Sequence, residues 1–258
     1  MPGPDLTLLL DAAEAAGRIA ERHFNAGFDI WDKGGGQGPV TEADLEIDRM
    51  LRAELCAARP DYGWLSEETE DDAARLSRET VFIVDPIDGT RAFVDGQKTF
   101  SHSLAIARDG VVTAAVVHLP LLNKTYRAET GGGAWCNAQR LTVAPRQETI
   151  GATVLAGKFN LSPEHWRNGT PPAFARHFRP SLAYRMGLVA DASFDAMLTL
   201  RPTWEWDVAA GTLMVEEAGG IVTTTADTAP RFNNPKPALN GLIAAGETLH
   251  SGLMAHLI

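Results

Sequence analysis

An apolar strand pattern that runs directly into acidic residues constrains this chain more than any other feature. The stretch 81–90 has the sequence Val-Phe-Ile-Val-Asp-Pro-Ile-Asp-Gly-Thr, and its apolar beginning favours a buried β-strand. Pro86 has no backbone donor and a fixed φ, which predicts that the strand stops at Asp85. Gly89 permits a tight reversal with outward-facing backbone N–H groups. Two carboxylates, a hydroxyl and free amides are therefore expected at one strand end.

The corner 85–90 has two interpretations, and its own residues do not decide between them. Asp-Pro and Asp-Gly pairs are ordinary turn sequences, and most such turns have no further role. Carboxylate and carbonyl oxygens also suit hard cations such as Mg²⁺, and outward amides suit a phosphate. Because both acids directly follow a buried strand and Thr90 follows them, an ordinary turn and a metal or phosphate site are equally good interpretations.

Composition narrows the class of protein. The chain has 258 residues, 45% of them hydrophobic and 22% charged, which is typical of a globular protein with a large core. A formal net charge of -10 argues against a nucleic-acid polymer as partner. Cys56 and Cys136 lack metal-ligand spacing and favour a reduced, cytoplasmic protein. No apolar run reaches the roughly 18 residues that would span a membrane, and residues 1–5 lack the features of a signal peptide.

Two amphipathic helices are expected near the N-terminus. Apolar residues at three- and four-residue steps predict a helix over 5–24, with Asp5 as its N-cap. A second helix is expected after Thr41, its N-cap, with Asp44 near the capping-box position. Capping alone accounts for Asp44, and a second role in orienting a hydroxyl requires evidence from elsewhere.

Strand patterns dominate the rest of the first half. The segments 101–107 and 111–118 predict two strands joined by a hairpin turn, because an Asp-Gly pair lies between them. His102 and His118 lie within these strands without a ligand partner and are interpreted as structural. We expect residues 1–147 to form an α+β domain, an antiparallel sheet with helices on one side.

Beyond residue 147 the pattern changes to alternating strands and helices, which predicts an α/β domain over 148–258. Strands are expected over 153–156 and 221–224. Helices are expected over 187–198 and from Trp204 through Glu217. The chain is thus expected to have two domains with different strand arrangements.

Three polar residues outside the corner are further candidates for the site. Glu67 follows the short apolar segment 62–65, although the acids after it favour a solvated loop. Asp207 begins a helix, where an acid serves as a dipole partner or, if half-buried, as a metal ligand. Lys33 lies in the glycine-dense loop 31–39, which lacks the ending of a P-loop, and it is either a surface lysine or a neighbour of the phosphate.

Several of these segments together resemble the motifs of the inositol monophosphatase-like family. The resemblance rests on Glu67, the corner 85–90 and the segment 206–211, Trp-Asp-Val-Ala-Ala-Gly, in that order. The segment 39–44 resembles the first motif of the same family, and the similarity spans residues 6–250. Members are lithium-sensitive, Mg²⁺-dependent phosphomonoesterases. The resemblance implies an α+β or α/β fold, a layered αβαβα sandwich of the sugar-phosphatase type, and favours the site over the simple turn.

The resemblance also implies a metal centre. Glu67, Asp85 and the carbonyl of Ile87 would hold one Mg²⁺. Asp85, Asp88 and Asp207 would hold a second, and a weaker third ion would lie near Glu67. The first expected domain would supply most of the metal ligands, and the second would supply Asp207 and substrate contacts.

The family's chemistry implies how a phosphate ester would be bound and cleaved. Thr90 and Glu67 would position and deprotonate the attacking water, with Asp44 hydrogen-bonded to Thr90. Two metals about 3.5–4 Å apart would neutralise charge on the transferred group and on the leaving oxygen. Metal coordination would also lower the pKa of the bound water, so no histidine base is required. The backbone N–H groups of Gly89 and Thr90 would bind phosphate oxygens. The substrate-binding residues implied are Asp88, Gly89, Thr90 and Asp207.

Position 200 bears on which phosphate ester is cleaved. Inositol monophosphatases of this family carry a glutamate seven residues before the aspartate that corresponds to Asp207, whereas this chain has Leu200. A leucine accepts no hydrogen bond from a sugar hydroxyl, which argues against inositol. The segment 201–207 instead resembles the Gly-Pro-Thr-x-x-Trp-Asp segment of 3′(2′),5′-bisphosphate nucleotidases, with Arg201 in place of the glycine.

We therefore expect hydrolysis of adenosine 3′,5′-bisphosphate to AMP and phosphate. The segments 65–68 and 181–190 favour the same subgroup, although Pro180 replaces its usual glycine. Inositol 1-phosphate or histidinol phosphate hydrolysis is the alternative within the same chemistry. A non-catalytic, metal-responsive regulatory protein is the alternative of another class. The expected partners are a small phosphate ester and, at most, a second copy of the chain in a homodimer.

Overall fold

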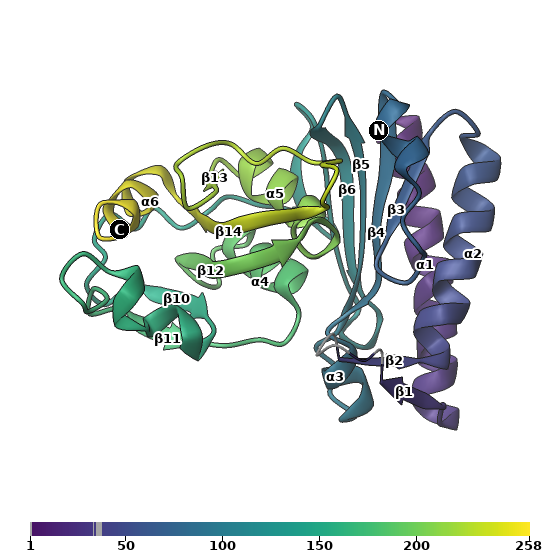
Figure 1. The fold of residues 1–258 in the computed structure, drawn as a ribbon, viewed down its shortest axis with the longest axis horizontal. Coiled ribbons are helices and arrows are strands. Elements are labelled where there is room, and N and C mark those ends of the chain that lie inside the picture. The colour runs from purple at the N-terminus through teal and green to yellow at the C-terminus, as the bar shows by residue number, and fades with distance from the viewer. Residues whose placement is uncertain (1, 33, 35–37) are drawn as a thin grey trace.

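Helical and sheet layers alternate across the molecule (Figure 1). The computed structural model describes residues 2–32, 34 and 38–258. Its helices are α1 (Pro4–Ala26), α2 (Glu42–Ala58), α3 (Thr90–Val94), α4 (Leu182–Ala190), α5 (Glu205–Glu217) and α6 (Glu247–Met254), and its 3₁₀ helices are η1 (Ala73–Ser77), η2 (Pro120–Leu122), η3 (Lys158–Leu161) and η4 (Pro163–His165). The order is α1 and α2, a 7-stranded sheet, α4 and α5, a 5-stranded sheet, and α6. This αβαβα order confirms the layered sandwich expected from the sequence.

The first sheet is antiparallel except at one edge. Its 7 strands, in spatial order, are β3 (Gly63–Ser66), β4 (Thr80–Asp88), β5 (Ser101–Arg108), β6 (Val111–Leu119), β7 (Lys124–Glu129), β8 (Gly133–Cys136) and β9 (Gln139–Arg140). β3 and β4 are parallel, and the remaining pairs are antiparallel. Asp109 and Gly110 have φ angles of 50° and 76°, which confirms the hairpin turn between β5 and β6.

The second sheet is mixed. Its 5 strands, in spatial order, are β11 (Ala175–His177), β10 (Thr153–Ala156), β12 (Ala196–Trp204), β14 (Ala238–Ala245) and β13 (Ile221–Thr223). β10 is parallel to both neighbours, and β14 is antiparallel to both of its own. A 2-stranded hairpin, β1 (Ile30–Asp32) and β2 (Pro39–Thr41), precedes α2. The division into domains 1–147 and 148–258 stays a prediction.

The helix ends agree with the sequence at α2 and differ at α1. Thr41 caps α2, and Asp44 completes the capping box as expected. The N-cap of α1 is Gly3 rather than Asp5, because Pro4 occupies the first helical position. Asp5 lies within the first turn, where its carboxylate accepts hydrogen bonds from Arg59 Nε at 2.9 Å and Tyr62 Oη at 3.0 Å.

Helices cover both faces of the first sheet: those of the first half lie on one face, as expected, and helices of the second half cover the other. Phe82 and Val84 of β4 pack into a cluster with α1 and α2. Ile83, which points to the opposite face, packs into a cluster with α4 and α5. The second half of the chain supplies these two helices, and no pattern within the first half indicates them.

The helix expected over 187–198 is confirmed as far as Ala190 and is wrong beyond it. α4 ends at Ala190, Ala192 adopts a left-handed φ of 59°, and β12 begins at Ala196. β12 lies between β10 and β14, and its first three residues, all apolar, are buried. A continuous apolar pattern does not distinguish a buried strand from a buried helix.

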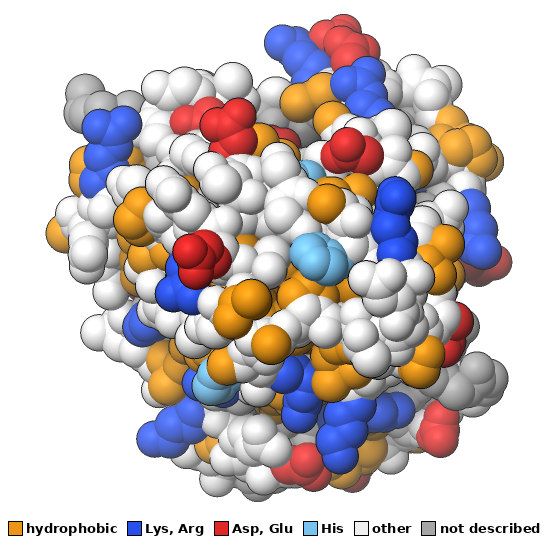
Figure 2. Space-filling model, turned by 90° about the vertical axis from the view of Figure 1, so that its left-hand side faces the viewer, with side chains coloured by type: hydrophobic (Ala, Val, Ile, Leu, Met, Phe, Trp, Pro, Cys, Tyr) orange, Lys and Arg blue, Asp and Glu red, His pale blue; other side chains and the backbone are white. Residues whose placement is uncertain are grey.

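The outer face of the second half carries side chains of every type. Figure 2 shows this face, on which acidic, basic and hydrophobic side chains are interspersed. Such mixing is ordinary for a solvent-exposed layer. Asp85, Asp88 and Asp207, which the sequence singles out, lie instead where α5 meets the first sheet.

Candidate metal and catalytic site

β4 continues past the proline and carries a bulge at the acidic corner. The strand expected to stop at Asp85 runs to Asp88, which corrects that prediction. β3 pairs with β4 only as far as Val84, so β4 then pairs, among the described strands, with β5 alone. The register shifts between Asp85 and Asp88, and Pro86 lies in this irregularity, where a missing N–H is tolerated.

The bulge turns both carboxylates to the same face of the sheet. In a regular strand, residues i and i+3 point to opposite faces. Here Asp85 lies opposite Ser103 and Asp88 lies opposite Ser101, so β4 contains one residue more than β5 over this stretch. Ser103 Oγ donates to the carbonyl of Trp206 at 2.9 Å, which identifies the shared face as the one against α5.

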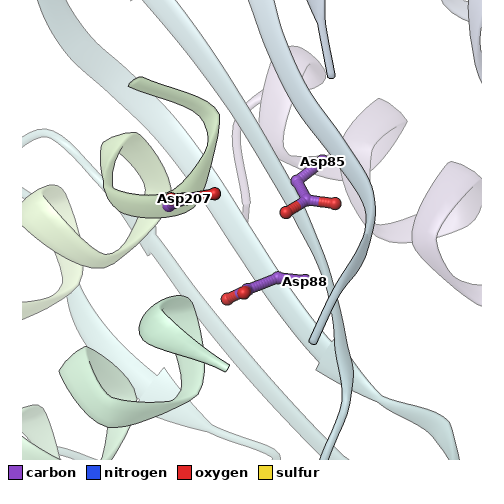
Figure 3. Close-up of side chains that lie close together, drawn as sticks. All are labelled: Asp85, Asp88 and Asp207. Carbon is purple, nitrogen blue, oxygen red and sulfur yellow. The ribbon is translucent and has the colours of Figure 1, made fainter. Parts of the chain in front are cut away.

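Asp207 joins this pair from the second half of the chain. It lies in the first turn of α5, as the sequence indicates. One carboxylate oxygen of each of Asp85, Asp88 and Asp207 lies within 4.8 Å of the others (Figure 3). Asp85 and Asp88 are 2% and 6% exposed, and Asp207 is half-buried. The fold therefore brings three carboxylates together at a position with little access to solvent.

Glu67 approaches the same corner because β3 lies beside β4. Its backbone N–H donates to the carbonyl of Val84 at 3.2 Å, immediately after β3 ends. Burial raises the pKa of Asp85 well above its usual range, and the charge of Glu67 raises it further. The pKa of Asp207 is also raised well above its usual range, most by burial and next by the charges of Asp88 and Glu67. Glu67 thus acts electrostatically on both acids.

Asp48 of α2 anchors the loop that carries Glu67. Its two carboxylate oxygens accept hydrogen bonds from Ser66 Oγ at 2.5 Å and from Thr69 Oγ1 at 2.6 Å. Glu67 lies between these two anchored residues, and Asp48 itself is 6% exposed. Sequence reasoning missed Asp48, since an acid inside an amphipathic helix has no local signal of such a contact.

The electrostatics of the three acids fit a bound cation. The pKa of Asp85 is raised by burial and by the charges of Glu67, Asp88 and Asp207. Oδ1 of Asp85 is buried and has no hydrogen-bond partner among the described residues. A buried carboxylate oxygen without a partner is costly, and a hard divalent cation is the ligand that an all-oxygen set of this kind prefers. The residues present therefore fit Mg²⁺.

Asp88 is held by the beginning of α4. Its Oδ2 accepts hydrogen bonds from Ser181 Oγ at 2.7 Å and from the N–H of Ala183 at 2.6 Å. Ser181 is also the N-cap of α4, because its Oγ accepts from the N–H of Tyr184 at 2.9 Å. Burial raises the pKa of Asp88 to about 6, and these hydrogen bonds oppose the rise. Sequence reasoning did not assign Ser181 to the site, although a serine before an apolar run is an N-cap signal.

The hydroxyl of Thr90 lies in a small network behind the acids. Thr90 Oγ1 lies 3.2 Å from Asp44 Oδ1 and 3.1 Å from the carbonyl of Ile87, both of which accept hydrogen bonds. The other oxygen of Asp44 accepts from the N–H of Thr41 at 2.8 Å. Gly89 adopts a left-handed φ of 98° immediately before α3, the reversal that the sequence predicts. Asp44 therefore caps α2 and contacts Thr90 at once.

Lys33 and residues 35–37 of the glycine-dense loop 31–39 lie outside the described residues. None of the described helices is both long and apolar enough to cross a lipid bilayer.

Comparisons with known proteins identify the class to which this fold and site belong. A sequence profile described as the inositol monophosphatase family matches residues 4–257. An inositol-1-monophosphatase of Mesorhizobium japonicum is 34% identical over 84% of this chain and 84% of its own. A 3′(2′),5′-bisphosphate nucleotidase CysQ of Aggregatibacter actinomycetemcomitans is 32% identical over 71% of each chain. The solved structure of an IMPase from Thermotoga maritima superposes with a TM-score of 0.84 at 28% identity, covering 98% of this chain and 96% of the other.

The layered fold and the buried acidic corner thus define a metal-dependent phosphatase. The chain belongs to the inositol monophosphatase family. As a member of that family it is a phosphoric monoester hydrolase, which acts on small phosphate esters. Family membership confirms the resemblance read from the motifs of the sequence.

Proposed function

We propose that the acidic corner holds two Mg²⁺ ions, with a weaker third near Glu67. The proposed ligands are Glu67, Asp85, the carbonyl of Ile87, Asp88 and Asp207. Support comes from the clustered carboxylate oxygens within 4.8 Å and from the unpartnered buried oxygen of Asp85. When bound, the ions would neutralise charge on the phosphate and on the leaving oxygen.

The chain's own residues would bind the ester and accept the proton. Thr90 Oγ1 is oriented by Asp44 and by the carbonyl of Ile87, at 3.2 and 3.1 Å. We propose that Thr90 and Glu67 orient the attacking water and that Glu67 takes its proton. The N–H groups of Gly89 and Thr90 would bind phosphate oxygens, because the left-handed Gly89 lets the backbone approach the substrate closely. Asp88 and Asp207 would contact the substrate from the other side.

A nucleoside 3′(2′),5′-bisphosphate is the substrate we propose, and two arginines beside Asp207 carry this choice. The charges of Arg201 and Arg185 lower the pKa of Asp207, against the larger rise caused by burial and neighbouring acids. The guanidinium of Arg185 lies 4.4 Å from the centroid of the Phe178 ring, and its Nε donates to the carbonyl of Arg179 at 2.5 Å. In a chain of net charge -10, these two cations would attract a second anionic group of the substrate.

The position of Leu200 favours the same substrate over inositol. Leu200 packs against the apolar cluster between the second sheet and α6. Its backbone N–H donates to Asn160 Oδ1 at 3.0 Å, which fixes the start of the bulge in β12. Because this side chain is apolar and packs toward α6, position 200 supplies no acceptor for an inositol hydroxyl, and unpaired polar groups cost binding energy.

Inositol 1-phosphate is the second candidate substrate. A relative with 34% identity is named an inositol-1-monophosphatase, which supports this candidate. Histidinol phosphate completes the set of small esters that the same metal chemistry would hydrolyse.

Phosphate release by the full chain with Mg²⁺ tests the choice of substrate. We expect kcat/KM to be highest for adenosine 3′,5′-bisphosphate among the three esters. Arg201→Ala should raise KM for the bisphosphate about tenfold, the effect of losing one charge-assisted hydrogen bond, and leave release from inositol 1-phosphate unchanged. Arg18→Ala, an exposed arginine of α1, is the matched control. A higher kcat/KM for inositol 1-phosphate would overturn the proposed substrate.

A further inference from the structure

His102 of β5 lies opposite the bulge that shapes the acidic corner. Ser103 and Ser101 of β5 lie opposite Asp85 and Asp88 of β4, and His102 is the one residue of β5 between these two serines. Over the same stretch β4 has Pro86 and Ile87. The ring of His102 bonds directly to this extra length of chain, since its Nδ1 lies 2.5 Å from the carbonyl oxygen of Pro86.

The ring of His102 lies on the face of the sheet away from the acids. Leu104, two residues along β5, packs with α1 and α2, and His102 shares that face. The side chain is 0% exposed and lies between Phe100, edge-on at 6.1 Å, and His118, stacked at 6.0 Å between ring centroids. Nε2 is buried and has no hydrogen-bond partner among the described residues.

These contacts fix the tautomer of the ring. A carbonyl oxygen only accepts hydrogen bonds, so the nitrogen that faces Pro86 carries the hydrogen. Burial lowers the pKa of His102 to about 3, so the ring is neutral and has a single N–H to donate. That N–H is therefore on Nδ1, and Nε2 carries a lone pair without a hydrogen-bond partner among the described residues.

The hydrogen bond sets the orientation of one peptide unit in the bulge. The carbonyl of Pro86 belongs to the peptide that joins Pro86 to Ile87, so fixing it fixes the backbone angles on either side. Asp85 and Asp88 flank this peptide, and the carbonyl of Ile87 follows it. Groups that orient metal ligands in this way are worth about ten- to a hundredfold in metal affinity.

We propose that His102 is a positioning residue for the metal site: by holding the Pro86 carbonyl on the α1 side of the sheet, it keeps the Asp85 and Asp88 carboxylates turned toward α5. The inference rests on the proposed metal function of these acids. His102 does not touch the substrate, and it acts through the backbone of the bulge. The sequence assigns it only a structural role, because its partner is a carbonyl on the neighbouring strand.

Mg²⁺ binding to the purified full chain, measured by calorimetry without substrate, tests the proposal. His102→Val keeps a strand-forming apolar side chain and removes the donor, and we expect Mg²⁺ affinity to fall about ten- to a hundredfold. His102→Asn retains an N–H donor near the position of Nδ1, and we expect affinity within about threefold of the wild type, the effect of a slightly weakened hydrogen bond. His118→Val is the matched control, because His118 stacks on the same ring but bonds Thr125 instead.

Long-range ¹H–¹⁵N NMR of the metal-free chain gives an independent reading of the tautomer of His102. A proton on Nδ1 supports the proposal, and a proton on Nε2 overturns it. Wild-type affinity in His102→Val, or equal losses in the valine and asparagine variants, would also overturn it. Should the valine variant not fold, the asparagine variant and the tautomer decide. A wild-type chain that binds no Mg²⁺ would instead remove the metal site itself, so the two failures are distinguishable.

Discussion

At the scale of single residues, the corner keeps carboxylates in surroundings that disfavour their charge. Asp85 and Asp88 are almost fully buried, and one oxygen of Asp85 has no hydrogen-bond partner in the described part of the chain. Burial and mutual repulsion raise the pKa of Asp85 and of Asp207 well above the usual range. Clusters of this kind are typical of functional sites, where a ligand present in the working state offsets the cost.

Substitution of Asp88 by asparagine separates catalysis from folding. We expect Asp88→Asn to lower Mg²⁺-dependent phosphate release by on the order of a thousandfold, because a charge that would stabilise the transition state is lost. The fold should persist, since the amide fills the same space and removes one repulsion. Colorimetric phosphate release and thermal unfolding of the same preparation measure the two effects. Unchanged release would contradict the proposed metal centre.

The stability of the metal-free chain should fall as pH rises. Burial raises the pKa of Asp88 from 3.8 to about 6, so between these values the folded chain holds a proton that the unfolded chain has released. The free energy of unfolding therefore decreases through this window, by about 3 kcal/mol for Asp88 alone. Urea unfolding in EDTA across this pH range measures the decrease.

The control for the pH effect is the Asp88→Asn variant, which has no carboxyl at this position. Its free energy of unfolding should decline less steeply with pH than that of the wild type. Saturating Mg²⁺ should also flatten the wild-type curve, because a ligand that binds only the folded state stabilises it. Equal slopes in wild type and variant would show that Asp88 titrates normally.

At the scale of elements, the beginnings of helices hold the acidic corner in place. α5 presents Asp207 in its first turn, and the N-cap of α4 is Ser181, whose hydroxyl donates to Asp88. Ser101 of β5 lies 3.0 Å from the same hydroxyl, so strand and helix meet at this oxygen. A single serine thus links α4, β4 and β5.

Removing this hydroxyl should affect both stability and metal binding. We expect Ser181→Ala to lower the free energy of unfolding by about 1–2 kcal/mol, the usual cost of losing an N-cap. It should also weaken Mg²⁺ binding, because Asp88 would lose one of the donors that orient it. Urea unfolding and calorimetry measure the two effects. Ser251→Ala in α6, where the hydroxyl donates to the carbonyl of Glu247 one turn earlier, should change neither.

At the scale of the whole molecule, one buried arginine ties the two halves of the chain together. Arg75 of η1 pairs with Asp71, and its Nη1 donates to Asn233 Oδ1 at 2.6 Å. Its Nη2 also donates to the carbonyl of Asn234 at 2.9 Å. Glu205, the first residue of α5, accepts from the backbone N–H groups of the same two asparagines, at 2.6 and 2.9 Å. Arg75 therefore steadies the helix that presents the last acid of the corner.

Loss of this arginine should destabilise the whole fold. We expect Arg75→Met to lower the free energy of unfolding by about 2–4 kcal/mol, because charge-assisted hydrogen bonds are lost and buried acceptors are left unpaired. Urea unfolding followed by circular dichroism measures the change. Arg78→Met replaces an exposed arginine of the same segment and should cost less than about 0.5 kcal/mol. Similar values for both variants would contradict the role given to Arg75.

Features that depend on neighbouring residues could be predicted from the sequence. The β4 strand, the capping box of Thr41 and Asp44, and the left-handed Gly89 each follow from patterns a few residues long. The acids of the corner lie in local motifs, and these motifs resemble those of the family to which the chain belongs. Short-range sterics and hydrogen bonding decide such features wherever the segment lies in the fold.

Tertiary structure alone decided which contacts these local features make with distant parts of the chain. The continuation of β4 to Asp88, the hydrogen bond from His102 to the bulge, and the anchoring of Asp88 by Ser181 all require a partner from another strand or helix. The split of 187–198 into a helix end and a strand likewise depends on where β10 and β14 lie. The sequence by itself determined which oxygens are available, because side-chain chemistry is local. Packing determined that they meet within 4.8 Å, because only long-range contacts bring α5 against β4.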